Sequence, residues 1–245
     1  MSQLNNPFGG ILYYKERTAS TMHDARNNLS HGAIFLTDHQ EQGQGRYPTR
    51  KWISYSEDLT FTLTLQQSQV LLKGPLPLLI ALSLYRTMVT LCKKNQIESL
   101  RIKWPNDLLF DSQKLAGILC QSHDDYYLIG IGMNIHPRFE DQHHMTAITP
   151  LFPPIGLGDI LESPVNKHIL LEKVLHHIQL TLSDASWCES FDQVLFRPSN
   201  PITYEVGSTT ITGYIEQISH EGSLGIRDAL TNDLIYIYAG EVTRR

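Results

Sequence analysis

Alternating and periodic apolar positions predict a β-rich chain with a few helices. Residues 59–65 read LTFTLTL, apolar at every second position, which predicts a half-buried strand. Apolar runs within 32–40, 99–103 and 126–135 predict further strands, the last with glycines where side chains do not fit. Apolar residues at helical spacing predict helices over about 75–95 and 166–183, and Ser20 or Thr21 can cap a helix over about 21–29.

The segment RIKWPNDLLF, residues 101–110, predicts a strand that enters a tight polar turn and returns as a second strand. The following LLFDSQKLAGILCQS alternates around a turn at DSQ and predicts a hairpin. Successive strands of this kind favour a largely antiparallel or mixed sheet. We expect the helices to cover one side of it, which is an α+β fold.

A boundary is predicted near FRPSNPITYEVG, residues 196–207, where two prolines with serine and asparagine mark a linker or sharp turn. The short strands that follow at close spacing are typical of a small β-barrel. We therefore expect two domains, residues 1–196 and 197–245.

Composition narrows the class of protein. The chain has 245 residues, 41% of them hydrophobic, and a formal net charge of −5, which argues against a general nucleic-acid binder. Three widely spaced cysteines, Cys92, Cys120 and Cys188, favour buried thiols in a reducing compartment over a disulfide framework. The N-terminus lacks the pattern of a secretion signal, and the apolar run at 75–91 contains Arg86, so we expect a cytoplasmic protein without a membrane span.

A glycine-rich loop is the first candidate for binding chemistry. Gly43 and Gly45 allow close backbone approach to a ligand, and Arg46, Arg50 and Lys51 add positive charge beside them. Such a loop suits phosphate, although no Gly-Lys-Ser/Thr follows as in a Walker A motif. A plain solvated loop is the alternative reading of the same residues.

The second candidate is a charged cluster formed by Lys103, Asp107 and Lys114. Strand alternation can direct Lys103 and a neighbour into one cleft, where lysine suits a developing oxyanion or phosphate and aspartate can orient a nucleophile or hold Mg²⁺. A surface position is the alternative for any single lysine. The histidine pairs at 143–144 and 176–177 lack the spacing of three or four that a helical metal site prefers, so we expect no metal site made of side chains.

Taken together, these segments resemble the biotin–protein ligase family. The residues that carry the resemblance are ST at 20–21, HQEQGQGR at 39–46, RKW at 50–52, IKWPND at 102–107, KLAGIL at 114–119 and IGIGMNI at 129–135. The C-terminal strands resemble the SH3-like domain of the same family. The resemblance implies a mixed sheet backed by helices, similar to class II aminoacyl-tRNA synthetases, with the small barrel appended.

The resemblance implies a ligase that forms C–N bonds in two steps. ATP, with Mg²⁺, activates biotin as biotinyl-5′-AMP, and a lysine of a biotin carboxyl carrier domain of a carboxylase then takes the biotinyl group. Carried over by position, Lys114, Arg46, Asp107 and Lys103 are the catalytic residues. Biotin would contact Ser20, Thr21, Met22, Gln40, Gly43, Lys114 and Gly117, and the adenylate would contact Gln44, Gly45, Arg46, Trp52, Asn106 and Asn134.

The glycine-rich loop departs from the family pattern. Gln44 stands where the family has an arginine, and Pro48 stiffens a loop that is one residue longer than usual. Two alternatives therefore stay open, a lipoate-type acyl ligase and a non-catalytic protein that binds biotin or its adenylate. The first predicted strand lies within GILYYKERTAST, residues 10–21, and only about ten residues precede it, so we expect no DNA-binding domain. A monomer or a homodimer fits the resemblance equally well.

Overall fold

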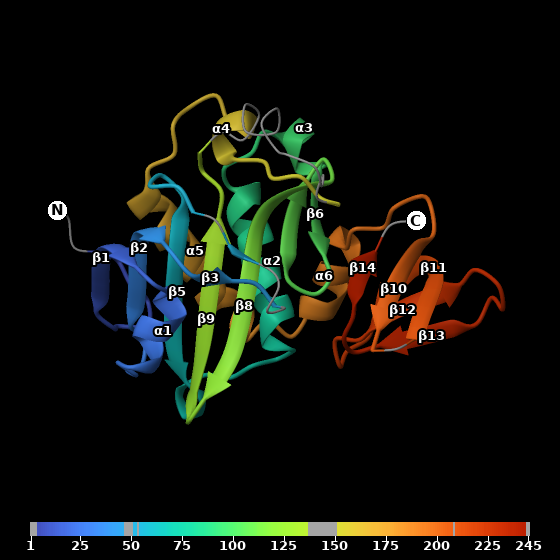
Figure 1. Ribbon diagram of the computed structural model, residues 1–245, viewed down its shortest axis with the longest axis horizontal. Coiled ribbons are helices and arrows are strands. Elements are labelled where there is room, and N and C mark those ends of the chain that lie inside the picture. The colour runs from blue at the N-terminus through green and yellow to red at the C-terminus, as the bar shows by residue number, and fades with distance from the viewer. Residues whose placement is uncertain (1–3, 47–50, 53, 137–150, 208, 244–245) are drawn as a thin grey trace.

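The computed structural model describes residues 4–46, 51–52, 54–136, 151–207 and 209–243 of the chain. In this part, a seven-stranded sheet carries the helices, and a five-stranded sheet follows at the C-terminal end (Figure 1). In spatial order, the larger sheet consists of β1 (Leu12–Thr18), β2 (Ile34–Gln40), β5 (Leu59–Gln66), β9 (Tyr126–Met133), β8 (Gln113–His123), β7 (Asp107–Phe110) and β6 (Leu100–Lys103). Strands β1 and β2 are parallel and the other neighbours are antiparallel, which confirms the predicted mixed sheet.

The main apolar core lies on one face of this sheet. Alternate residues such as Phe61 of β5 and Ile131 of β9 point toward it and are buried. Covering this face are α2 (Leu76–Val89), α5 (Lys167–Leu182) and α6 (Trp187–Val194), with the shorter α3 (Lys94–Ile97), α4 (Leu157–Ile160) and the 3₁₀ turn η1 (Gln67–Gln69) at the margins. The predicted helices over 75–95 and 166–183 are thus α2 and α5, and Asn166 caps α5 by accepting hydrogen bonds from the backbone N–H groups of His168 and Ile169.

The remaining helix, α1 (Thr21–Arg26), lies on the opposite face, so the expectation that all helices cover one side is wrong. A separate small core of Ala25, Ala33, Phe35 and Leu128 holds it there. Ser20 caps the helix as predicted, and α1 ends at Arg26 rather than near residue 29. The remainder of this face, beside α1, is where the cavity described below lies.

Strand β5 is buried on both faces, and the prediction of a half-buried strand is therefore wrong. Its leucines and Phe61 enter the main core, while Thr60, Thr62 and Thr64 are at most 2% exposed on the other face. A threonine hydroxyl can be buried when it finds a hydrogen-bond partner, as Thr62 does with Thr21 at 2.9 Å. The alternation was a true strand signal, but the polar face meets α1 and the cavity rather than solvent.

The two hairpins predicted after residue 100 are present. The first joins β6 to β7 through the turn at 104–106, and the second joins β7 to β8 through Asp111 and Ser112, both with positive φ. Within the glycine-rich loop, β3 (Gly43–Gln44) pairs with β4 (Lys51–Trp52). The two described ends of the loop therefore pair as a short two-stranded ribbon. Tyr47, Pro48 and Arg50 lie outside the described residues.

The C-terminal sheet is antiparallel throughout, as expected for a small SH3-like domain. Its strands, in spatial order, are β13 (Leu234–Ile237), β12 (Leu224–Asp228), β11 (Thr209–Ile218), β10 (Ile202–Val206) and β14 (Glu241–Thr243). Its buried residues, among them Tyr204 and Ile226, belong to the same apolar cluster as the main core. We propose the domain boundary between residues 196 and 197 because it falls just before β10.

None of the helices in the described part of the chain is both long enough and apolar enough to span a membrane. Helix α2, which forms from the longest apolar run, is packed on the main core. Cys188 is buried, Cys92 and Cys120 are half-buried, and all three thiols are free.

Candidate active site

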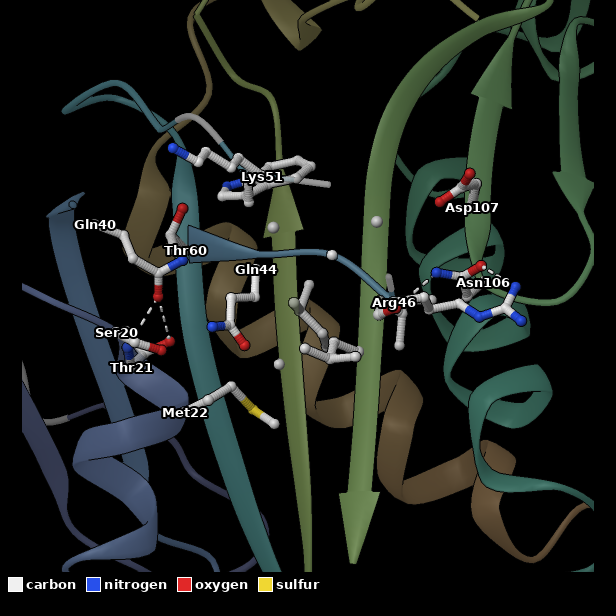
Figure 2. A pocket seen from close by; sticks show the side chains of 18 of the residues that line it. Ser20, Thr21, Met22, Gln40, Gln44, Arg46, Lys51, Thr60, Asn106 and Asp107 are labelled. Carbon is white, nitrogen blue, oxygen red and sulfur yellow. Dashed lines mark hydrogen bonds between the residues drawn. The ribbon is translucent and has the colours of Figure 1, made fainter. Parts of the chain in front are cut away.

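A cavity of about 820 Å³ opens on the sheet face that carries α1 (Figure 2). Its floor exists because neighbouring strands place small residues in one row. Asp107 of β7, Gly117 of β8, Gly132 of β9 and Thr60 of β5 are successive register partners across the sheet. Because strand partners at the same register point to the same face, the two glycines leave a hollow between the carboxylate and the threonine.

The hollow is partly filled by the indole ring of Trp52. A Cβ atom at Gly132 would lie 2.2 Å from Trp52 Cε2, so only glycine lets the indole lie flat on β9. Trp52 Nε1 and the hydroxyl of Thr60 are buried without a hydrogen-bond partner among the described residues. These two groups are therefore candidate partners for a polar group of a ligand that enters the cavity beside Trp52 and Thr60.

One end of the cavity is a neutral hydrogen-bonding cluster. The side-chain oxygen Oε1 of Gln40 accepts from Thr21 N at 2.9 Å and from Thr21 Oγ1 at 3.1 Å, and Thr21 Oγ1 in turn accepts from Thr62 Oγ1. This relay fixes the orientation of Gln40 and leaves its NH₂ group as a donor beside Gly43. Ser20 lies next to it at the cap of α1, as Figure 2 shows.

Met22 extends from α1 over the same floor. Its sulfur would lie 3.0 Å from a Cβ atom at Gly130. The first glycine of IGIG, Gly130, therefore makes room for Met22, as the second, Gly132, makes room for Trp52. A flexible thioether fills an apolar cavity wall without fixing its shape.

The opposite end of the cavity is charged. Asp107 lies 3.0 Å from Lys103 Nζ through Oδ2 and 2.8 Å from Lys114 Nζ through Oδ1. Lys103 and Asp107 are register partners at the two ends of the 104–106 turn, which brings them together. The structure thus assembles the three charged residues that the sequence suggested for one cleft.

Lys114 reaches this cluster through an irregularity in β8. The register shifts between Leu108 and Leu109 of β7, which pair with Ala116 and Lys114, so Leu115 is an extra residue. In a regular strand Lys114 and Gly117, three residues apart, would face opposite sides. The bulge places both on the cavity side, and a Cβ at Gly117 would lie 3.1 Å from Lys114 Nζ.

The electrostatics of the cluster keep the carboxylate ionised. Burial of Asp107 opposes ionisation, but the ammonium groups of Lys114 and Lys103 outweigh it and lower the pKa of Asp107 to about 2. The aromatic rings of Phe152 and Trp52 lie 5.2 Å from Lys103 Nζ and 6.0 Å from Lys114 Nζ. Two cations with one carboxylate leave a site of net positive charge, suited to an anionic ligand.

Asn106 and Asn134 fasten the strands that carry this cluster. Asn106 Nδ2 donates to the carbonyl of Ile118 at 2.8 Å, and Arg46 donates to its Oδ1 at 3.5 Å. Asn134 Nδ2 donates to the carbonyls of Lys114 and Ile155 at 3.0 and 3.1 Å. The amide group of Asn134 therefore fixes the backbone that presents Lys114, and contact of Asn134 with a nucleotide stays a prediction.

The described part of the glycine-rich loop lies along the cavity. Gln44, Gly45 and Arg46 line it together with Lys51 and Trp52. Gly43 is buried where β3 pairs with β4. A Cβ atom there would lie 2.5 Å from the Trp52 carbonyl oxygen, so the position has no space for a side chain. Every residue predicted for the site thus lies at this cavity or in the ribbon beside it.

No cluster of three or more histidine, cysteine, aspartate or glutamate side chains exists among the described residues. Asp107 is the sole carboxylate in the described lining, and it is engaged by two lysines. The pair at 143–144 lies outside the described residues.

Sequence reasoning missed three contributors. Thr60 and Thr62 were signalled by the polar positions of LTFTLTL, which were assigned to solvent. Phe152, beside Lys103, stands in a stretch of sequence without a periodic apolar pattern.

These features define a class of protein with one cavity on a sheet face, neutral and polar at one end and cationic at the other. Residues 14–134, which contain both ends, match the model of the biotin/lipoate A/B protein ligase family. This part of the chain is therefore a domain of that family, and the resemblance predicted from sequence is confirmed.

Individual relatives of the chain are named as biotin ligases rather than lipoate ligases. The chain is 28% identical over 233 residues to a biotin–[acetyl-CoA-carboxylase] ligase of Paracoccus denitrificans, a match that covers 86% of this chain and 92% of the relative. It is 28% identical over 143 residues to the chloroplastic biotin–protein ligase 1 of Arabidopsis thaliana, covering 55% of this chain and 39% of the relative. The matches to the two Arabidopsis ligases span about two-fifths to one half of those proteins.

The fold agrees with solved structures. The biotin protein ligase of Aquifex aeolicus, in complex with biotin and ATP, superposes with a TM-score of 0.76 at 24% identity, covering 95% of this chain and 97% of that one. The ligase of Leishmania major in complex with biotin superposes with a TM-score of 0.64 at 23% identity over 93% and 98% of the two chains. At this identity the likeness confirms the predicted fold, with both its large and its C-terminal sheet.

Proposed function

We propose that this chain is an ATP-dependent biotin–protein ligase. It would activate biotin as biotinyl-5′-AMP and transfer the biotinyl group to a lysine of a biotin carboxyl carrier domain. The observation that carries the proposal is the joint geometry of one cavity, with Gln40 and Thr21 at one end and Lys103, Asp107 and Lys114 at the other.

The neutral end suits the ureido ring of biotin. A urea offers one carbonyl acceptor and two N–H donors, and hydroxyl and amide groups supply both kinds of partner. The Ser20 hydroxyl can accept or donate, the Thr21 hydroxyl can accept while its own proton goes to Gln40, and the oriented NH₂ of Gln40 donates. Met22 and Trp52 provide apolar and aromatic walls for the thiophane ring and valeryl chain.

The cationic end suits the first reaction, in which two anions meet. A carboxylate oxygen of biotin attacks the α-phosphorus of ATP, an O–P bond forms, the bond to the β-phosphate oxygen breaks, and pyrophosphate leaves. Lys114, Lys103 and Arg46 can offset charge on the carboxylate and phosphate as they approach. Held before the reaction, these cations need little reorganisation during it.

Asp107 is better suited to orient than to accept a proton. A carboxylate with a pKa near 2 is a weak base at neutral pH. Its two oxygens instead hold the two ammonium groups in fixed directions. In the second step the neutral amine of the acceptor lysine attacks the acyl carbon, the acyl–phosphate bond breaks, AMP leaves, and the amine gives its proton to solvent.

Mg²⁺ fits this site as a companion of ATP rather than as a resident metal. The described lining offers one carboxylate, already paired with two lysines, so phosphate oxygens would supply most of the ligands. When bound, the ion neutralises phosphate charge. Lys103 and Lys114 can share that task from the protein side.

The test is biotin-dependent release of pyrophosphate from ATP and Mg²⁺ with the protein at stoichiometric concentration. We expect a burst of about one equivalent with biotin, because a ligase that retains its adenylate stalls without an acceptor. Lipoate runs in parallel, and a biotin carboxyl carrier domain is added afterwards to follow acceptor labelling by mass.

The outcomes separate the alternatives. A larger burst with lipoate than with biotin would assign a lipoate-type ligase. Biotin binding by calorimetry with no burst for either acid would assign a non-catalytic binding protein. Adenylate formation without labelling of the carrier would refute the acceptor and keep the activation step.

A further inference from the structure

The C-terminal sheet makes a direct hydrogen bond to the turn that carries the charged cluster. Trp104 follows Lys103 in the turn between β6 and β7 and is 4% exposed. Its Nε1 donates to the carbonyl oxygen of Gly222 at 3.0 Å, 118 residues later in the chain. Gly222 lies in the turn between β11 and β12, so the bond links the two sheets.

The turn that presents this carbonyl is held rigid from within. The Ser219 hydroxyl accepts from the backbone N–H groups of Glu221 and Ser223 at 3.2 and 3.3 Å, and the Ser219 carbonyl accepts from Gly222 N at 2.9 Å. Gly222 itself has φ +84°, a conformation that favours glycine. The direction of its carbonyl is therefore set by the turn and not by Trp104 alone.

Gly222 is also wedged against the first turn of α2. A Cβ atom there would lie 2.4 Å from Pro75 Cγ and 3.0 Å from Leu78 Cδ1. Because α2 packs on the main core, this contact fixes the carbonyl relative to the large sheet.

The 104–106 turn, which carries Trp104, also shapes the candidate site. Asn106 is tied to β8 by two hydrogen bonds with the backbone of Ile118, at 2.8 and 3.0 Å. Lys103 and Asp107 form their ion pair across the turn. A shift of the buried indole would move these residues together, and misplacement of about 1 Å can cost 100-fold in rate.

We propose that Trp104 is a positioning residue through which the C-terminal sheet fixes the Lys103–Asp107 turn for reaction. The inference rests on the proposed ligase function and adds a task for the C-terminal sheet within it. Trp104 acts through its neighbours, and the hydrogen bond to Gly222 is the connection.

A separate anchor between the two parts of the chain gives a matched control. Asp192 of α6 accepts from the backbone N–H of Ile218 at 3.0 Å and pairs with Arg197 at 2.7 Å. Arg197 in turn donates to the Glu216 carbonyl at 3.1 and 3.0 Å. Among the described residues, the hydrogen bonds and the ion pair of this anchor join α6 and Arg197 to β11, and none of these joins the 104–106 turn.

The experiment compares Trp104→Phe with Asp192→Asn in the full chain. Phenylalanine keeps an aromatic ring but has no N–H to donate. We expect Trp104→Phe to slow the pyrophosphate burst about 10-fold with biotin affinity changed less than about 2-fold, and Asp192→Asn to leave the burst rate unchanged. Amide hydrogen exchange over residues 103–107 should rise in the first variant and not in the second.

Gly222→Ala is the second variant, because its Cβ would push the carbonyl from Pro75 while Trp104 stays intact. It should slow the burst like Trp104→Phe, and the double variant should add little to either. A burst rate in Trp104→Phe equal to wild type, or an equal loss in Asp192→Asn, overturns the proposal. If wild type gives no burst, the ligase function has failed instead, and unchanged exchange at 103–107 in Trp104→Phe would still refute the positioning role.

Discussion

Lys114 Nζ lies 2.8 Å from Asp107 Oδ1, on the neighbouring strand, because β8 contains one residue more than its partner at this point. Without the extra residue, Lys114 would point into the main core. The ion pair therefore depends on a backbone irregularity, and it brings the group proposed to meet both anions to the floor of the cavity.

The first prediction concerns this lysine. Lys114→Ala should lower the rate of the biotin-dependent pyrophosphate burst at least about 100-fold, because a cation that meets the reacting carboxylate and phosphate is lost. The protein should stay folded, since Asp107 keeps Lys103 as a partner. We expect a loss of about 1–2 kcal/mol in the free energy of unfolding by urea, less than for a fully enclosed pair, because the Lys114 side chain is 32% exposed.

Lys93→Ala is the matched control. Lys93 also pairs with a carboxylate, that of Glu162, but both side chains are exposed and neither belongs to the described cavity lining. It should change neither the burst nor the unfolding curve. Normal activity in Lys114→Ala together with a large drop in stability would show that Lys114 is structural only.

The second prediction concerns the acid limb of stability. The pKa of Asp107 is lowered from 3.8 to about 2 in the folded chain, so its ionised form stabilises the fold above about pH 4. This contribution, about 2 kcal/mol, is lost as the pH falls from about 4 through 2. The difference in unfolding free energy between wild type and Asp107→Asn should therefore shrink as urea unfolding is repeated at pH 6, 4 and 3.

Asp233→Asn serves as the control because Asp233 is exposed, in the connection between β12 and β13. Its difference from wild type should stay small at every pH. A wild-type advantage over Asp107→Asn that is constant from pH 6 to pH 3 would contradict the lowered pKa.

Much of the fold could be predicted from residue patterns because most strands follow a regular period. The turns at KWPND and DSQ, the helices of the main core and the small C-terminal sheet all have local signals. The position of α1 was different. Met22 and Ala25 give it an apolar side, but the face of the sheet that receives this side is decided by the distant Phe35 and Leu128.

The site was predictable in its residues but not in its arrangement. Motif spacing indicated Lys103, Asp107 and Lys114, yet no pattern shows that Leu115 is the extra residue that turns Lys114 toward the cavity. Similarly, glycines 130 and 132 read as gaps between side chains, while the partners that fill them, Met22 and Trp52, come from elsewhere in the chain. Long-range packing determined both outcomes.

The third prediction concerns Arg46. Arg46→Gly should preserve the pyrophosphate burst and convert it into continuing release, because the adenylate is no longer retained and the site becomes free for another turn. Free biotinyl-AMP acylates exposed amines, so an added bystander protein should become biotinylated, as blotting with streptavidin would show. Arg46→Lys keeps the positive charge and should confine labelling to the carrier. Labelling confined to the carrier in Arg46→Gly as well would reject the assignment of Arg46 to adenylate retention.

The fourth prediction ranks two glycines on the same strand by the neighbour that each would meet. At Gly132 an added Cβ would lie 2.2 Å from the rigid indole of Trp52, whereas at Gly130 it would lie 3.0 Å from the flexible end of Met22. Met22 can change rotamer, but Trp52 is confined by the β3–β4 ribbon and must leave the floor. Gly132→Ala should therefore weaken biotin binding by about 10- to 100-fold in calorimetry, and Gly130→Ala by less than about 5-fold. Equal losses in the two variants would mean that the floor tolerates no side chain at all, and that Trp52 has no special part in forming the cavity.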